Sequence, residues 1–144
     1  MKRKSSFAYL ALLAGCLVSL SAPAVAHHGD AGRYDEAPYT LTGTVVSLRL
    51  INPHSIITLD VPDANGQLVK WQAELGAPQQ LTRDAGWTKT TVKAGDTLTL
   101  IGRRARSGDP YLNMTERANI VMTDTGKEIF RTANFGQPPL APAK

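Results

Sequence analysis

Histidine is the residue type in this sequence that most directly suggests chemistry, and the three histidines are His27, His28 and His54. An Ala-Val-Ala tripeptide ends at Ala26, where a signal peptidase would cut and make His27 the N-terminal residue. The free α-amine and the imidazole of His27 could then chelate one metal ion together, and His54 or His28 could supply a third nitrogen. Because three nitrogens in a plane suit Cu(II), the sequence supports a copper-binding hypothesis.

A purely structural role for the histidines is the alternative. His54 follows Asn52 and Pro53, which interrupt two apolar, β-branched runs, so we expect it at a sheet corner where it could also cap a turn. Zinc is disfavoured, because a structural zinc site takes four ligands, usually with cysteine among them. Cleavage after Ala26 would remove the single cysteine, Cys16, and with it any thiol or disulfide chemistry.

Two groups of residues are candidates for binding a ligand other than a metal. One is the corner formed by Asn52 and His54, and the other is the basic cluster of Arg103, Arg104 and Arg106. The cluster could hold an anion such as a phosphate or a lipid headgroup. The alternative is a solvated sheet edge, where arginine discourages strand pairing.

The sequence argues against an enzyme. It contains no Gly-x-Ser-x-Gly motif, no glycine-rich phosphate loop and no dinucleotide fingerprint. Trp71 falls on the apolar face of an alternating run and Glu74 on the opposite face, so we expect Trp71 in the core. Glu74 alone does not make the carboxyl pair that a glycosidase needs. We therefore expect a non-enzymatic binding or accessory module, with copper binding as the alternative.

The N-terminal residues have the pattern of an export signal. Lys2, Arg3 and Lys4 precede an apolar run at 7–20 that is too short to span a membrane. We predict that residues 1–26 are a cleaved signal peptide and that the mature protein is periplasmic. No later run of 18 apolar residues is present, so we expect no transmembrane span.

Lipidation is the alternative fate of this segment. Leu13-Ala14-Gly15-Cys16 matches the box that precedes a lipidated cysteine, and the protein would then be anchored through Cys16. The apolar run continues past Cys16, which favours cleavage after Ala26. Removal of the three basic residues at the start lowers Lys+Arg from 16 to 13, against 12 Asp+Glu. Such a balance gives no reason to expect a nucleic-acid partner, so an envelope protein or a small ligand is the expected partner.

The rest of the sequence predicts a small all-β fold. Alternating or β-branched runs, separated by turn residues, indicate strands at 39–51, 54–61, 67–75 and 97–104, a fifth within 111–123 that is best at 118–122, and a short last strand at 128–131. A short helix is expected at 77–85, and Gly43 and Gly102 suggest bulges or bends. This order predicts an OB-like barrel of five to six strands with one short helix after the third strand, and a sandwich is the alternative.

The predicted organisation has four parts. Residues 1–26 form the signal peptide, 27–38 a polar N-terminal arm, 39–132 the OB-like barrel and 133–144 a Pro/Ala-rich disordered tail.

A set of short motifs follows the Ala-His-His start of the mature chain. In order they are Gly43-x-Val45, Asn52-Pro53-His54, Gly66, Trp71-x-x-Glu74, Leu81, Gly86-Trp87 and Gly95-Asp96. In this combination the chain resembles a family of small exported proteobacterial proteins classed only as a domain of unknown function. The resemblance covers nearly the whole mature chain and implies one exported domain without implying an activity. The strand order is also similar, more distantly, to that of periplasmic OB-fold proteins.

Overall fold

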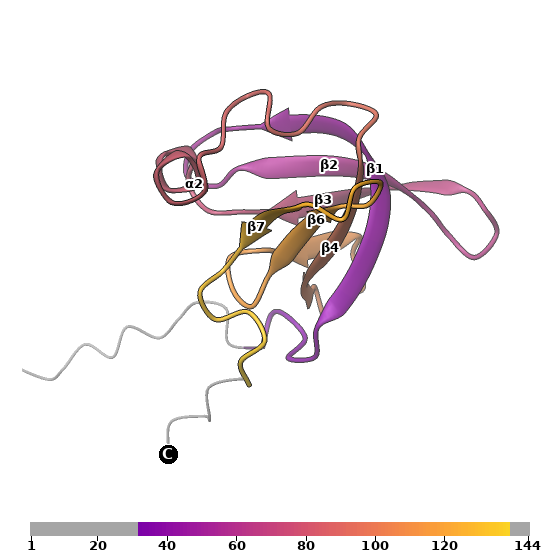
Figure 1. Cartoon of the computed structure of the whole chain (residues 1–144). Helices are drawn as coiled ribbons and strands as arrows, with labels where there is room; N and C mark the ends of the chain where they lie inside the picture. Colours follow the sequence, from indigo (N-terminus) through magenta and orange to yellow (C-terminus); the bar gives the residue numbers. More distant parts are fainter. Residues whose placement is uncertain (1–31, 139–144) are drawn as a thin grey trace, which may run out of the picture.

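The computed structural model describes residues 32–138 (Figure 1). The predicted signal peptide, Cys16, His27, His28 and the last part of the predicted tail lie outside the described residues. The elements are β1 (Tyr39–Arg49), β2 (Ile56–Pro62), β3 (Leu68–Glu74), α2 (Pro78–Ala85), β4 (Thr97–Arg104), β5 (Tyr111–Asn113), β6 (Asn119–Met122) and β7 (Glu128–Arg131).

Five of the strands close into a barrel. β1 pairs with β2 and with β4, β2 pairs with β3, β3 runs parallel to β5, and β5 returns to β4. The helix α2 lies between β3 and β4 in the chain, as the OB-like prediction requires. The predicted fold class is therefore confirmed, and β6 and β7 extend the sheet beyond the barrel.

The fifth barrel strand is not at the position that the sequence favoured. β5 covers only Tyr111–Asn113, whereas the predicted segment at 118–122 forms β6, outside the closed ring. The two strands use different parts of the same β4 edge: β6 pairs with Leu98 to Ile101, and β5 with Arg103 and Arg104. A three-residue strand has too short an alternation to stand out, whereas the longer apolar run at 118–122 does.

Alternating burial along the strands builds the core. Trp71 and Ala73 on β3 are buried, with exposed Gln72 between them, which confirms the predicted core position of Trp71. The core also contains Leu41, Val45, Ile57, Leu59, Leu75, Leu98, Leu100, Leu112, Met114 and Ile120. The hairpin between β2 and β3 projects away from this core (Figure 1), and Leu68 on it is 67% exposed.

The two strand glycines permit close approaches between strands. A Cβ atom at Gly43 would lie 2.7 Å from Val61 Cγ2, and one at Gly102 would lie 2.6 Å from Met114 Sδ. The irregular register in β1 falls between Val45 and Ser47, two residues after Gly43. The barrel therefore needs these glycines mainly because a side chain would not fit.

The helix covers one end of the barrel. Pro78 begins α2, and Gly86, in the left-handed conformation, ends it, as the sequence predicted. Leu81 faces inward, and Trp87 is 1% exposed with its Nε1 donating to the carbonyl of Ile129 at 2.9 Å. This contact ties the helix end of the barrel to β7.

Candidate functional site

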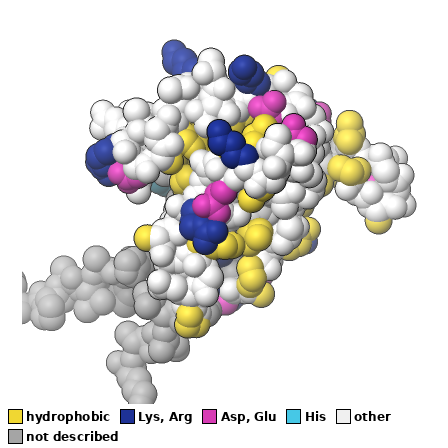
Figure 2. Space-filling model, in the orientation of Figure 1, with side chains coloured by type: hydrophobic (Ala, Val, Ile, Leu, Met, Phe, Trp, Pro, Cys, Tyr) yellow, Lys and Arg dark blue, Asp and Glu magenta, His cyan; other side chains and the backbone are white. Residues whose placement is uncertain are grey.

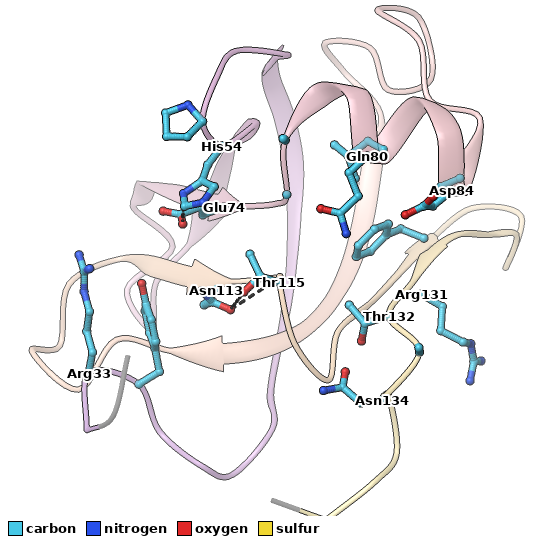
Figure 3. Close-up of a pocket in the computed structure, with 18 residues that line it drawn as sticks. Arg33, His54, Glu74, Gln80, Asp84, Asn113, Thr115, Arg131, Thr132 and Asn134 are labelled. Atoms are coloured by element: carbon cyan, nitrogen blue, oxygen red, sulfur yellow. Dashed lines mark hydrogen bonds and ion pairs between the residues drawn. The ribbon is translucent and has the colours of Figure 1, made fainter. Parts of the chain in front are cut away.

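A cavity of about 1020 Å³ opens at the end of the barrel next to α2 (Figure 3). Its walls come from the β1–β2 corner, the ends of β3 and β5, the helix, β7 with the residues after it, and the segment before β1. The volume is at the upper end of the range for small-molecule pockets. Because the end of β3 leads directly into α2, these walls come from five stretches of sequence, which together form one hollow.

His54 and Glu74 form a pair on one wall of this cavity. Nδ1 of His54 lies 2.7 Å from Oε1 of Glu74, and the side chains are 49% and 17% exposed (Figure 3). Since Glu74 ends β3 and His54 precedes β2, the pairing of these two strands brings the side chains together. A carboxylate at Nδ1 orients the ring and leaves Nε2 as the nitrogen that can bind a ligand. Asn52, the other predicted corner residue, is exposed and does not line the cavity.

Asn113 supplies a buried polar group to the cavity wall. The residue ends β5 and is 2% exposed. Its Oδ1 accepts hydrogen bonds from the backbone N–H and from Oγ1 of Thr115, at 3.1 and 2.9 Å. The backbone donor settles which end of the amide is the oxygen. Within residues 32–138, no group accepts a hydrogen bond from Nδ2, so this amide can donate to a molecule in the cavity.

Most charged side chains around the cavity have partners. Asp84 accepts two hydrogen bonds from Arg83, the shorter at 2.7 Å, and Arg131 donates to Glu128 at 2.6 Å. The hydrogen bond from Arg131 holds the pKa of Glu128 below its ordinary value. Arg33 is exposed, and its guanidinium lies 5.6 Å from the centre of the Tyr34 ring. Formal charge is thus largely balanced around the cavity.

The remaining polar groups are neutral amides and hydroxyls. They belong to Gln80 on α2, Asn113 and Thr115 at the end of β5, and Thr132 and Asn134 after β7 (Figure 3). Such groups can donate and accept hydrogen bonds without a counter-ion. The arrangement is suited to binding an uncharged polar molecule.

The structure places Arg103 inside the protein. Its side chain is 7% exposed and bonds to Glu36 Oε1 at 3.0 Å, to Glu116 Oε2 at 3.1 Å and to the carbonyl of Asp35 at 3.3 Å. Its guanidinium also lies over the ring of Tyr34, which is itself 2% exposed. Arg103 therefore fixes the segment before β1 onto the barrel.

Arg104 and Arg106 have different surroundings. Arg104 stacks on the rings of Tyr39 and Trp71, with its guanidinium carbon 5.1 and 5.3 Å from the ring centres. Arg106 is half exposed, lies 3.5 Å from Asp35, and lines a second hollow of about 670 Å³. The predicted ligand-binding role of the three arginines stays a prediction, and Arg106 is the one that lines either of the two hollows described for residues 32–138.

The predicted site residues are therefore not gathered at one place. His54 lines the larger cavity and Arg106 the second hollow, although Arg33 and Tyr34 line both. Figure 2 shows basic side chains scattered over this face of the molecule, several of them beside acidic ones. Asn113 and Gln80 were missed by sequence reasoning. For Asn113 the sequence did offer one signal, because a polar residue between Leu112 and Met114 interrupts an apolar run.

The fold and the cavity define a small OB-like barrel with a polar pocket at its helix end. The chain belongs to a family of unknown function (DUF6152), which matches residues 14–112 and so stops short of β6 and β7. This match confirms the resemblance to a domain of unknown function. The proteobacterial origin and the motif set stay predictions.

Other comparisons add little. No curated protein matches the chain. One similar solved structure is described as "Crystal structure of the ZRD-deleted mutant of TiaS in complex with agmatine", with 18% identity and a TM-score of 0.42. The match covers 70% of this chain and 24% of that one, and a likeness this weak supports no argument about fold or ligand. Within residues 32–138, no helix has the length and apolar character needed to span a membrane.

Proposed function

We propose that this protein is a non-enzymatic binding or accessory module of the periplasm that holds a small ligand in the cavity beside α2. The observation that carries the proposal is Asn113, which lines the cavity and whose Nδ2 has no acceptor among residues 32–138. An amide N–H that faces a cavity and has no protein acceptor can donate a hydrogen bond to a bound molecule. The proposed periplasmic location is supported by the export signal that the sequence predicts at residues 1–26.

We propose a non-enzymatic role because of where the reactive side chains near the cavity lie. The carboxylates of Glu74 and Asp84 are each engaged by a basic neighbour. Ser55, next to His54, is fully buried with its Oγ enclosed, and it does not line the cavity. A nucleophile would need access to a substrate and a base within reach.

A pair of substitutions on α2 tests the binding proposal. Gln80→Trp would fill the cavity from an exposed position, and Gln79→Trp is the matched control because Gln79 is exposed on the same helix and does not line the cavity. Each protein is dialysed against a periplasmic extract, and retained small molecules are identified by mass spectrometry. We expect retention by the wild type and by Gln79→Trp and loss in Gln80→Trp. Equal retention by all three proteins, or no retention by the wild type, would overturn the proposal.

Copper binding is the second candidate, and the His54–Glu74 pair favours it. The carboxylate leaves Nε2 of His54 available, as in histidine metal ligands. Arg33, which follows His28 by five residues in the sequence, lines the same cavity as His54. No cluster of three or more His, Cys, Asp or Glu residues suited to a metal ion occurs within residues 32–138. A Cu(II) site therefore requires His27 or His28.

A Cu(II) competition titration on the mature protein, with its intact mass measured, tests this candidate. We expect one-to-one binding tighter than that of a free N-terminal His-His peptide. One residue added before His27, or His54→Ala, should weaken binding strongly while the fold is retained. Binding no tighter than that of the peptide, or a lipidated Cys16, would rule the site out.

A further inference from the structure

The charge balance of the cavity beside α2 narrows the ligand that it can take, if the binding function proposed above holds. The acidic side chains on its walls, Glu74 and Asp84, are already in contact with side chains of this protein, His54 at 2.7 Å and Arg83 at 2.7 Å. A charged ligand would need a counter-charge within the cavity, because desolvating an unpaired charge is costly. Arg33 is exposed to solvent and lies against the Tyr34 ring. The walls therefore favour a ligand without formal charge.

The hydrogen-bonding groups on the cavity wall limit the choice of ligand further. Gln80, Asn113 and Asn134 contribute amides, and Thr115 and Thr132 contribute hydroxyls (Figure 3). The two hydroxyls are used within the protein, since Thr115 donates to Asn113 and Thr132 bonds to the backbone of Ala118. The Nδ2 groups of Asn113 and Asn134 and the amide of Gln80 have no partner among residues 32–138. A ligand must therefore present several oxygens that accept hydrogen bonds, as the hydroxyls of a sugar can.

Two apolar side chains complete the wall. Phe130 and Leu81 line the same cavity, and Phe130 is held edge-to-face against Trp87 with ring centres 5.9 Å apart. A fixed aromatic ring next to amides matches a sugar, which has an apolar C–H face and a polar rim. We infer that the cavity beside α2 binds a neutral sugar, of one or two rings, with Asn113 Nδ2 donating to a ligand oxygen.

A titration followed by NMR tests the inference on the mature protein. The probes are di-N-acetylchitobiose and cellobiose, compared with their charged two-ring counterparts, deacetylated chitobiose and cellobiouronic acid. We expect a neutral disaccharide to shift the side-chain amide signals of Asn113 and Gln80 saturably, and the charged sugars to bind at least ~10-fold more weakly.

Asn113→Asp is the main variant, because it keeps the oxygen that accepts from Thr115 and removes the free donor. We expect it to weaken disaccharide binding at least ~10-fold, with Gln80→Trp losing binding and Gln79→Trp matching the wild type. Unchanged far-UV circular dichroism would show that each variant is folded.

The outcomes separate this inference from the proposed function. If no neutral sugar binds but the wild type still retains another small molecule from periplasmic extract, the sugar inference is wrong and the binding function stands. If the charged sugars bind as tightly as the neutral ones, the inference also fails. If neither sugars nor any extract molecule binds, both proposals fall.

Discussion

The arginine cluster and the cavity beside α2 are both rich in polar side chains, but their polar groups are used differently. Arg103 is buried with three hydrogen-bonded partners and an aromatic ring, and Arg104 lies on two aromatic rings. In the cavity, Asn113 is equally buried and keeps its Nδ2 without an acceptor among the described residues. Judged by residue type alone, the arginines would have ranked above Asn113 as candidate ligand-binding residues.

This difference shows that a polar group is available for binding only when the fold leaves it without a partner. Glu36 and Glu116 satisfy Arg103, so the cluster joins the segment before β1 to the barrel. The same contacts place Arg33 between the two hollows. Arg103 is thus engaged in holding the fold together, whereas the cavity keeps polar groups without a partner among the described residues.

The largest loss of stability is expected for a substitution in the core beneath the arginine cluster, at Trp71. Trp71→Ala should lower the free energy of unfolding by about 3–5 kcal/mol, because it removes a buried ring that stacks on Tyr39 and supports Arg104. Urea denaturation of the variant and the wild type measures the loss. Gln72→Ala, the exposed neighbour on β3, is the control. A loss below about 1 kcal/mol would contradict the core assignment.

Arg103→Met should cost about 1–3 kcal/mol, because it removes the hydrogen bonds of a buried guanidinium to two half-exposed carboxylates while it keeps most of the volume of the side chain. Arg106→Met, in the same cluster but half exposed, should change stability by less than about 0.5 kcal/mol. Thermal melts of both variants make the comparison. Similar losses of stability in the two variants would contradict the argument that Arg103 matters more to the fold because it is buried.

Lowering the pH should weaken the ion pairs that Glu36 makes with Arg103 and Arg117, because Glu36 becomes protonated. A hydrogen bond from Arg117, supported by the charge of Arg103, holds the pKa of Glu36 below its ordinary value of 4.5. A lowered folded-state pKa contributes stability that is full above pH 4.5 and is lost as pH falls through the folded value. Glu36→Gln should therefore be less stable than the wild type at pH 7, and the difference should shrink towards pH 3. A difference independent of pH in melts across this range would contradict the argument.

The smallest effect on stability is expected at the cavity. Gln80→Trp changes an exposed helix position and should alter the free energy of unfolding by less than about 0.5 kcal/mol while it blocks ligand retention. Denaturation curves measured on the proteins used for the retention experiment check this. A large loss of stability would mean that Gln80 supports the fold and does not merely face the cavity.

Much of the fold could be predicted from local pattern. The alternation at 97–104 gave β4 with its observed bounds, and the Pro78 start and Gly86 end delimited the helix. The short β5 was missed because it has three residues, and its parallel pairing with β3 depends on contacts between strands distant in the chain. Of the predicted site residues, His54 lines the cavity, whereas no local signal pointed to Gln80.

The amino-acid sequence by itself determined the all-β class, the order of strands and helix, and the core position of Trp71, because period-two alternation and turn residues act over a few neighbouring positions. Tertiary structure alone decided that Arg103 would be buried among carboxylates and that Asn113 would keep a free donor facing a cavity. Whether a polar group finds a partner depends on residues brought close from distant parts of the chain, and no local pattern records those neighbours.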